Sequence, residues 1–400
     1  MLHEDIIIGL DIGTTSIQAV VGAKQKTQEV PRVIGWGEAV SRGMHRGVVA
    51  NVEEVVPAIR EAFQKAVNRA GVQCNEAIVS VSGKHIFVRP SKGLVVASRA
   101  DGEVSREDIQ RALIQAEATP NSNREILHNL VRKWTVDGEE VKDPLGMTGV
   151  QLEVETLVIE GGSPALKNIR KAVNLAGIKI KKLVLSPLAA GYAVLNSRQK
   201  GLGTLVLNIG SSTTGMVIFE EGNIFHTAIL ELGSAHATHD LVYGLQVDVD
   251  TAEKVKQSHG SALAENISLR DKVDLKKLGG EGSMPLHDIA VICEARFSEI
   301  LERVQKELKK VGRVSMLPGG VVLTGGGSRI PRLDKLAKKD LSLPVSRGVA
   351  QNIMGPEEIT QDPAFTTALG LIIWGFDENL TTPKDSSVSK IIRWLKNFIP

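Results

Sequence analysis

The chain has 400 residues, more than one ordinary hydrophobic core accommodates, so two or more domains are expected. Its composition, 42% hydrophobic and 24% charged, is that of a soluble globular protein. The formal net charge of only +2 gives no reason to expect nucleic-acid binding. The two cysteines, Cys74 and Cys293, lack the spacing of a metal site or a disulfide framework. No apolar stretch approaches the ~20 residues that span a bilayer, so we expect a cytoplasmic protein unless some segment tethers it.

The first eighty residues predict a strand, a small-residue turn, a return strand, a long helix and a further strand. The helical spacing stops at Gly71, a plausible C-cap. The predicted strands are 6–11, 17–21 and 77–81, and the predicted helix is 53–70.

Residues 84–162 have a different pattern and predict an inserted subdomain. Short β-rich pieces surround a single helical stretch. This segment separates the region before it from the region after it, and those two regions have similar sequence patterns. The predicted strands are 85–88, 94–97 and 152–159, and the predicted helix is 105–118.

The opening pattern returns in the second half of the chain. A helix at 164–176 and a strand followed by a helix within 183–196 precede it. The sequence LNIGSS of Leu207–Ser212 then repeats LDIGTT of Leu10–Thr15. Each copy is a buried strand, a small-residue turn and a β-branched return strand, so the sequence predicts two halves of related topology.

The last part of the chain predicts two helices, a strand–turn–helix unit and a flexible end. The helices are at 251–259 and 286–311. The sequence VVLTGGGSRIPRLDKLAKK then predicts a strand, a triple-glycine turn and a helix. After Gly375 the chain becomes polar and rich in turn residues, as in a short linker.

Three small-residue turns that follow strands predict a phosphate-binding cleft. Glycine lets the backbone approach an anion and point its N–H groups at it, and hydroxyls add donors. Two facing hairpins can hold a polyphosphate, and the third turn, at a helix N-terminus, can lie against the nucleoside. One such turn alone is usually an ordinary tight turn, but three of them favour a nucleotide site. The candidates are Asp11, Gly13, Thr14 and Thr15, then Asn208, Gly210, Ser211, Ser212 and Thr213, then Gly325, Gly326, Gly327 and Ser328.

The order of these turns resembles the phosphate-1, phosphate-2 and adenosine motifs of the actin, Hsp70 and hexokinase group, whereas no Walker A or Rossmann motif occurs. The resemblance implies an α/β fold of the actin-like type, a duplicated ribonuclease H-like fold with two large lobes around a cleft for ATP and Mg²⁺. It implies that Asp11 helps to hold the metal, that Gly233 belongs to the cleft and that a Glu–Lys pair reaches the ribose. That pair is Glu253 and Lys256, which a spacing of three places on one helix face; a solvated ion pair is the alternative.

Longer stretches resemble one branch of this group, the FtsA family of bacterial division proteins. They are VSVSGKHI at 79–86, REILHNLVRKWTVDGEEVKDPLGMTGVQLEVETLVIEGG at 124–162 and KLVLSPLAAGYAVL at 182–195. The middle one resembles the family's inserted subdomain, and the likeness covers essentially the whole chain. It implies subdomain 1A at 1–83 and 163–200, 1C at 84–162, 2A at 201–245 and 315–375, 2B at 246–314, a linker at 376–387 and a membrane-targeting helix at 388–400.

The chain departs from the family's pattern at the second phosphate turn. FtsA relatives usually have DxGGGTTD there, whereas this chain has Asn208 and Gly215 at the two acidic positions. Ser234 replaces one glycine of the next motif, and Ser186 stands where a glutamate is usual. Because the superfamily uses two strand-end aspartates to position Mg²⁺ and its waters, only Asp11 remains for that role. We therefore expect ATP binding with hydrolysis that is very slow or absent.

The last thirteen residues, VSKIIRWLKNFIP, have the spacing of an amphipathic helix with only positive charges on its polar face. Such a helix suits the headgroup layer of a membrane. The alternative is a terminal helix packed on the protein's own core. The family resemblance favours membrane contact, for which the candidates are Ile391, Ile392, Arg393, Trp394, Leu395, Lys396 and Phe398.

The resemblance also implies partners. FtsA-like proteins bind the C-terminal tail of FtsZ, the tubulin-like division GTPase, and the matching helix here carries Arg296, Arg303 and Lys306; a solvated helix face is the alternative. Other division proteins, self-association into filaments and anionic lipids are further implied, at the cytoplasmic face of the bacterial cell membrane at the division site.

The expected function is therefore to tether FtsZ filaments to the membrane and to help recruit later division proteins. Two alternatives share the fold. One is a pilus-assembly scaffold of the PilM type, which does not need its own membrane anchor. The other, less favoured, is a phosphotransferase of the sugar-kinase type, for which the sequence offers no evident catalytic base.

Overall fold

The computed structural model describes residues 4–377, apart from residue 26, residue 100 and residues 118–122. The predicted membrane helix at 388–400 and nearly all of the predicted linker lie outside the described residues. Within the described part of the chain, no helix is both long and apolar enough to cross a membrane.

The first lobe is built on a five-stranded sheet, ordered β11-β6-β1-β2-β3. The three N-terminal strands form an antiparallel meander, and β6 and β11 run parallel to β1. The strands are β1 (Asp5–Ile12), β2 (Ser16–Lys24), β3 (Arg32–Val40), β6 (Glu76–Val81) and β11 (Lys179–Leu185), with the short β4 (Met44–His45) and β5 (Val48–Val49) beside them.

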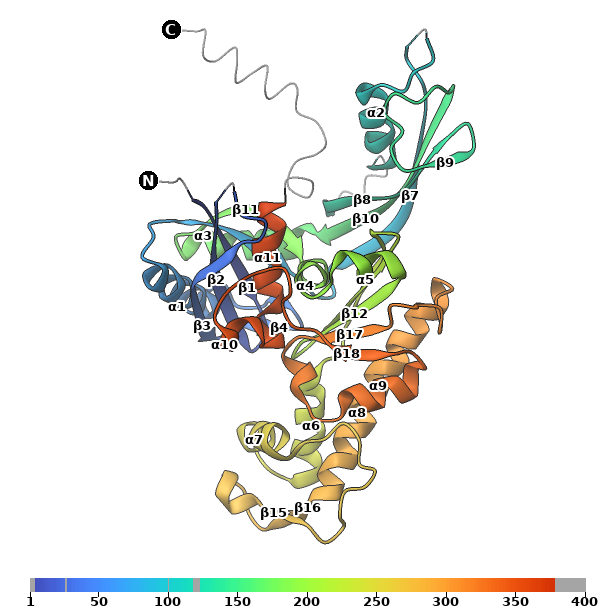
Figure 1. The fold of residues 1–400 in the computed structure, drawn as a ribbon. Helices are drawn as coiled ribbons and strands as arrows, with labels where there is room; N and C mark the ends of the chain where they lie inside the picture. Colours follow the sequence, from blue (N-terminus) through green and yellow to red (C-terminus); the bar gives the residue numbers. More distant parts are fainter. Residues whose placement is uncertain (1–3, 26, 100, 118–122, 378–400) are drawn as a thin grey trace.

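Helices cover both faces of this sheet (Figure 1). α1 (Val52–Ala70) and α3 (Ser163–Leu175) bury one face, and α4 (Ser186–Val194) and α11 (Thr366–Phe376) bury the other. α1 begins where the Asn51 side chain accepts a hydrogen bond from the Glu53 N–H, and it ends at Gly71, whose φ of 66° is left-handed. The predicted C-cap is confirmed.

The second lobe repeats the same sheet topology. Its order is β14-β13-β12-β17-β18, in which β12, β13 and β14 form the antiparallel meander and β17 and β18 run parallel to β12. The strands are β12 (Thr204–Ile209), β13 (Thr214–Glu220), β14 (Asn223–Leu230), β17 (Val321–Thr324) and β18 (Val345–Arg347). The duplication predicted from the two copies of the turn motif is confirmed.

Helices extend the second lobe away from the first one (Figure 1). α6 (Ser234–Leu245), α7 (Val249–His259) and the long α8 (Leu286–Lys310) form the outer part with β15 (Lys272–Asp274) and β16 (Ser283–Pro285), and α9 (Leu333–Leu341) packs on α8. α5 (Ser197–Leu202) and α10 (Glu357–Thr360) are short connecting helices.

The turn after β17 differs from its prediction. No α-helix begins at the triple glycine: a 3₁₀ turn spans Gly326–Arg329, and α9 begins only at Leu333. Pro331 is the reason, because proline disfavours the helical conformation in the residue before it, and Ile330 is accordingly extended.

The insert is a four-stranded antiparallel sheet, ordered β7-β10-β8-β9, with one helix on one face. Its elements are β7 (Ile86–Val96), α2 (Arg106–Glu117), β8 (Arg124–Val136), β9 (Glu139–Val141) and β10 (Gln151–Gly162). The prediction of two separate strands at 85–88 and 94–97 was wrong, because β7 runs continuously through Pro90. β7 is an edge strand, where a residue without an N–H is tolerated.

The two lobes are held together by the contact between α4 and α11. A Cβ added to Gly370 of α11 would lie 1.9 Å from the carbonyl oxygen of Ala189 in α4, so only glycine permits this approach. Leu188 and Ala189 of α4 and Leu369 of α11 lie in one core with residues of both sheets. The same two helices, α4 and α11, therefore pack against strands of both sheets. These contacts fix the positions of the strands, and each hairpin lies at the end of such strands.

Candidate functional site

The two predicted phosphate hairpins are equivalent residue by residue. Asp11 pairs with Gln18 in the first sheet, and Asn208 pairs with Gly215 in the second. In each hairpin the first glycine donates its N–H to the carbonyl of the residue three positions on, from Gly13 to Ser16 (3.0 Å) and from Gly210 to Thr213 (2.9 Å). Asp11 and Asn208 therefore occupy the same place in two copies of one structure.

Asp11 is held by a residue that sequence analysis did not single out. The Ser80 hydroxyl donates to Asp11 Oδ1 at 2.5 Å and accepts from the Ile12 N–H at 3.1 Å. Burial raises the pKa of Asp11 to about 6, although the Ser80 hydrogen bond opposes the shift. A divalent cation beside this carboxylate would favour its ionised form, so the site fits a metal ligand.

Asn208 has a different partner. Its side-chain amide donates to Thr367 Oγ1 at 3.0 Å, at the start of α11. Its amide oxygen faces Gly325, where an added Cβ would lie only 2.4 Å away. The contacts that hold the Asn208 side chain are therefore all with neutral groups. In the described part of the chain, no three His, Cys, Asp or Glu residues lie close enough together to hold a metal ion.

The second hairpin contains an unpartnered hydroxyl. Ser211 Oγ is buried and has no hydrogen-bond partner among the described residues. A buried donor without a partner is costly and points to a missing acceptor. The backbone carbonyls of the hairpin, in contrast, do have partners. Those of Gly210 and Ser211 accept hydrogen bonds from the N–H groups of Ser234 (2.9 Å) and Ala235 (2.8 Å), where α6 begins. The Ser211 hydroxyl therefore fits the oxygen of a phosphate.

Several of the other predicted glycines pack against this same hairpin. A Cβ on Gly233 would lie 2.5 Å from the Ser211 carbonyl, and one on Gly327 would lie 2.7 Å from the Ile209 side chain. Gly325 has a φ of 82°, which disfavours any other residue. Gly326 is exposed, unlike its two neighbours. The structure thus brings the second hairpin, Gly233 and the triple-glycine turn into one cluster.

The predicted ribose pair also joins this cluster, on the inner side of α7. Lys256 Nζ donates to Glu253 Oε2 (2.7 Å), to the Thr238 hydroxyl (2.8 Å) and to the Ser234 carbonyl (3.2 Å). Burial opposes ionisation of Glu253, but the Lys256 ammonium and the hydrogen bonds outweigh it and lower the pKa of Glu253. The lysine side chain is only 10% exposed, whereas that of Glu253 is 37% exposed. A ribose would meet the glutamate first, because all three ammonium protons of Lys256 already have acceptors.

An ion pair links the two lobes near this cluster. The described residues include an ion pair of 3.9 Å between Arg46 of the first lobe and Glu231, which precedes Gly233 in the second lobe. Ser186, where the family resemblance implies a glutamate, donates its hydroxyl to the Val81 carbonyl at 3.0 Å.

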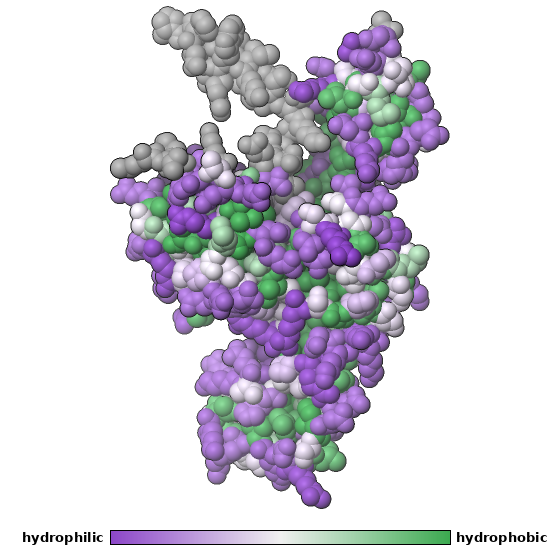
Figure 2. Space-filling view, in the orientation of Figure 1, coloured by the Kyte–Doolittle hydropathy of each residue, from purple (hydrophilic) through white to green (hydrophobic). Residues whose placement is uncertain are grey.

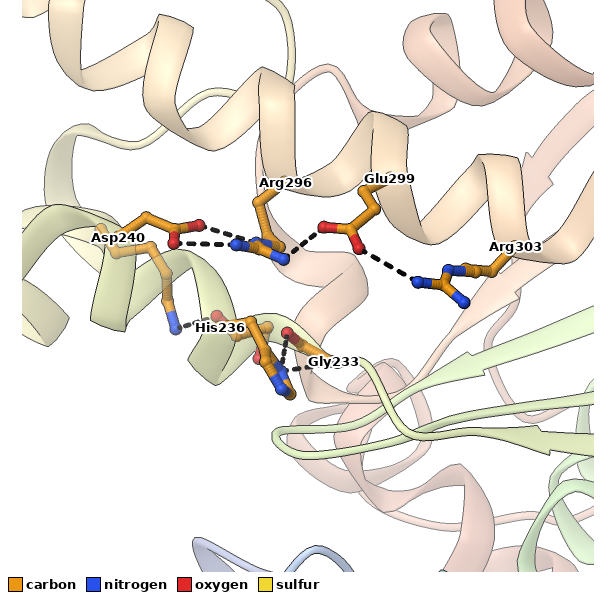
Figure 3. A network of polar contacts seen from close by, with 8 residues as sticks. Gly233, His236, Asp240, Arg296, Glu299 and Arg303 are labelled. Carbon is orange, nitrogen blue, oxygen red and sulfur yellow. Dashed lines mark hydrogen bonds and ion pairs between the residues drawn. The ribbon is translucent and has the colours of Figure 1, made fainter. Parts of the chain in front are cut away.

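The three predicted partner-binding cations lie on α8 and are all ion-paired within the chain. Figure 3 shows Arg296 between Asp240 of α6 and Glu299, with Arg303 on the other side of Glu299. The Arg296 guanidinium donates to both oxygens of Asp240, at 2.7 and 2.9 Å, and Arg303 lies 3.7 Å from Glu299. Lys306 pairs with Glu302 at 2.7 Å.

Sequence reasoning missed three residues of this site: Ser80, Thr367 and Thr238. Ser80 lies within a stretch that resembles FtsA, and its place at the end of the strand parallel to β1 is a signal that could have indicated it. Thr367 gives no such signal, since it lies 159 residues from Asn208 in the sequence.

Comparisons with known proteins agree with this architecture. A family model described as "Cell division protein FtsA" matches residues 205–370, and one described as "SHS2 domain inserted in FTSA" matches residues 83–160. The cell division protein FtsA of Pseudomonas aeruginosa is 34% identical over 378 residues, covering 93% of this chain and 90% of the relative. The FtsA of Bacillus subtilis is 34% identical over 376 residues, covering 93% and 84% of the two chains.

Solved structures share the fold at lower identity. A PilM–PilN type IV pilus biogenesis complex aligns with a TM-score of 0.68 at 18% identity, over 93% of this chain and 98% of the other. MreB5 of Spiroplasma citri bound to ADP aligns with a TM-score of 0.54 at 14% identity, over 94% and 97% of the two chains. The duplicated sheets and their hairpins define a protein of the actin-like class.

Identity at this level over nearly the whole length narrows the class to one family. The chain belongs to the FtsA family of bacterial cell division proteins.

Proposed function

We propose that this protein binds ATP with Mg²⁺ between its two hairpins and tethers FtsZ filaments to the cytoplasmic face of the bacterial membrane at the division site. The observation that supports nucleotide binding best is the pair of equivalent hairpins, one with the carboxylate of Asp11 and the other with the unpartnered Ser211 hydroxyl. Membership of the FtsA family supports the role in division. Recruitment of later division proteins and self-association into filaments are part of the same proposal.

The proposed nucleotide contacts divide among the residues described above. Asp11 would hold the metal through its waters, and the turn hydroxyls and the free N–H groups of both hairpins would hold the phosphates. Glu253 would accept from the ribose. Bound Mg²⁺ would supply charge neutralisation between the phosphate oxygens.

Hydrolysis is proposed to be very slow or absent. Asn208 is a neutral amide committed to Thr367, and Ser186 is committed to Val81, so neither places a carboxylate near an attacking water. ATP turnover and ATP binding are therefore to be measured separately. A turnover rate comparable to that of active actin-like ATPases, abolished by Asp11→Ala, would contradict this part of the proposal.

The proposed membrane tether is the terminal segment 388–400, on the basis of its sequence alone. Co-sedimentation with vesicles of phosphatidylglycerol tests it, with the full chain and with a chain ending at Asp385, each with and without ATP and FtsZ. We expect the full chain to pellet and to carry FtsZ with it. Equal pelleting of both chains would mean that the segment is not the tether.

The proposed FtsZ contact on α8 must displace existing ion pairs. An acidic peptide would replace Glu299 at Arg303 and Glu302 at Lys306, both of which are exposed pairs of little net stability. We expect Arg303→Ala combined with Lys306→Ala to weaken binding of a peptide from the FtsZ C-terminus. Lys272→Ala combined with Lys276→Ala, at exposed lysines around β15, is the matched control. Equal affinities of the two double variants would place the contact elsewhere.

A further inference from the structure

The positive charge of this protein is concentrated in one stretch of sequence. Between Gly161 and Phe219 there is no aspartate or glutamate, although acidic residues number 46 in the chain. The same stretch contains Lys167, Arg170, Lys171, Lys179, Lys181, Lys182, Arg198 and Lys200. Since the whole chain carries only +2, the rest of the protein is net acidic.

Folding places the first of these cations at exposed positions of α3 and β11, two neighbouring elements of the first lobe. Lys167 and Lys171 lie one turn apart on the solvent side of α3, and Leu175 continues the same row with 54% of its surface exposed. The chain turns at Gly177, and Lys179 and Lys181 then project from β11, an edge strand. We call the surface formed by Lys167, Lys171, Leu175, Lys179 and Lys181 the α3–β11 face.

The lysines of this face differ in their partners: Lys179 and, to a smaller extent, Lys181 lower the pKa of the Glu76 carboxyl. Lys167, Lys171 and Lys181 form no ion pair with the described part of the chain, whereas Lys179 pairs with Glu76 at 2.8 Å. Arg170 beside them pairs with Glu125 at 2.7 Å. Further acidic groups at this end of the lobe are Asp377, where α11 ends, and those at the start of β1, where Glu4 pairs with Arg32 at 2.9 Å and Asp5 is its neighbour. The free charge of the face is therefore positive.

The described chain also ends next to this face. Gly375 of α11 packs against Ile78 of β6, which pairs with Lys182 of β11, and the Lys182 ammonium lies 5.7 Å from the centre of the Trp374 ring. Figure 1 shows the last turn of α11 beside β11, at the opposite end of the molecule from β15 and β16. Residues 378–387 separate this point from the terminal segment, and ten residues span at most about 35 Å.

We propose that the α3–β11 face is a second membrane contact, which lies against anionic lipid headgroups and sets the orientation of the protein on the bilayer. The proposal rests on the membrane tether proposed above. Lysines near an anionic leaflet are attracted within a Debye length, and Leu175 offers an apolar side chain to the headgroup layer. Two contacts joined by a short linker bind together more strongly than either one alone. With only the tether, the lobes would take many orientations on the bilayer.

Charge-neutral substitutions in the full chain test this face. The variant Lys167→Gln, Lys171→Gln, Lys181→Gln removes the three unpaired lysines. The matched control is Lys272→Gln, Lys276→Gln, Lys277→Gln, which removes three exposed lysines at the far end of the molecule and gives the same net charge. Binding is measured by titration with vesicles of equal parts phosphatidylglycerol and phosphatidylcholine, and with phosphatidylcholine alone.

We expect the face variant to bind the mixed vesicles at least about tenfold more weakly than the unaltered chain, with a shallower salt dependence, and the control to change less than about twofold. Equal weakening of both variants would overturn the proposal, because net charge would then suffice. Unchanged vesicle binding by the face variant together with weaker binding of an acidic peptide would overturn it in favour of a protein partner. Binding that is lost only in a chain ending at Asp385 would overturn the face and leave the tether intact. No binding by the unaltered chain would refute the tether itself.

A fluorescence measurement at single positions tests the same proposal independently of the triple variants. On a Cys74→Ser background, a fluorophore attached at Lys171→Cys is compared with one attached at Lys277→Cys, with the buried Cys293 left in place. We expect spin-labelled headgroups to quench only the first fluorophore. Equal quenching at the two positions would show that the bilayer does not prefer the α3–β11 face.

Discussion

The two hairpins have the same backbone and carry different end groups, and this contrast bears directly on the proposed nucleotide site. Both turns close with the same hydrogen bond and leave hydroxyls at the tip. The first retains a carboxylate, Asp11, which Ser80 orients, and the second has an amide, Asn208, which Thr367 holds. In the proposed nucleotide site, the shared backbone would bind phosphate and the end group would bind the metal. The two copies can therefore differ in their end group while the hairpin backbone stays the same.

The largest expected effect comes from removing the remaining carboxylate. Asp11→Ala should weaken Mg²⁺-dependent ATP binding by about tenfold to a hundredfold, as expected for a charge-assisted contact of about 1.5–3 kcal/mol. Asn208→Ala should change it by less than about threefold, because Asn208 faces Thr367 and Gly325. Calorimetric titration with ATP, in Mg²⁺ and in EDTA, measures both. Equal losses in the two variants would mean that both hairpins contribute to the metal site.

The turn glycines should differ in how much they stabilise the fold. A Cβ at position 13 would lie 2.6 Å from the Ser16 carbonyl oxygen, whereas one at position 210 would lie 3.0 Å from that of Thr213. Gly13→Ala should therefore reduce the free energy of unfolding by about 2–3 kcal/mol and Gly210→Ala by about 1 kcal/mol. Chemical denaturation of the two variants measures the difference, and the opposite order would show that the first turn relaxes more easily than the second.

The ionisation of Asp11 predicts a pH dependence of stability, to which the neutral amide of Asn208 does not contribute. In metal-free protein the pKa of Asp11 is about 6, above its ordinary value of 3.8, so its contribution to stability is complete below pH 3.8 and is lost as pH rises through 6. Asp11→Asn removes that loss and should raise stability in EDTA by up to about 2 kcal/mol at pH 7.5, with no gain near pH 4. Denaturation curves at several pH values measure this. A gain that is independent of pH would show that ionisation is not its cause.

The smallest expected effect comes from placing a carboxylate at position 208. Asn208→Asp should raise the rate of ATP hydrolysis by a few-fold to about tenfold, because it supplies a second charge for the metal. The Thr367 hydroxyl can donate to the new carboxylate, so the hairpin should keep its position. A phosphate-release assay detects the change, with Asn208→Ala as the control. Unaltered turnover in Asn208→Asp would place the limit on hydrolysis elsewhere in the cleft.

The duplicated plan, the insert, the extent of most helices and the three glycine turns could be predicted from the sequence. These features have local causes: apolar periodicity, a glycine at the end of α1 and a repeated six-residue motif are visible without knowledge of the fold. The sequence also showed that the two end groups differ, because the two copies of the motif can be compared with each other.

The contacts that hold those groups could not be predicted and became visible in the folded chain. Ser80 reaches Asp11 across 69 residues of sequence, and Thr367 reaches Asn208 across 159. The structure showed that Lys256 already has three acceptors and that Pro90 lies within an edge strand. It also placed the acid-free stretch beside the end of α11. Such contacts depend on which strands become neighbours, and strand order is set by the packing of whole sheets and helices, which no local pattern encodes.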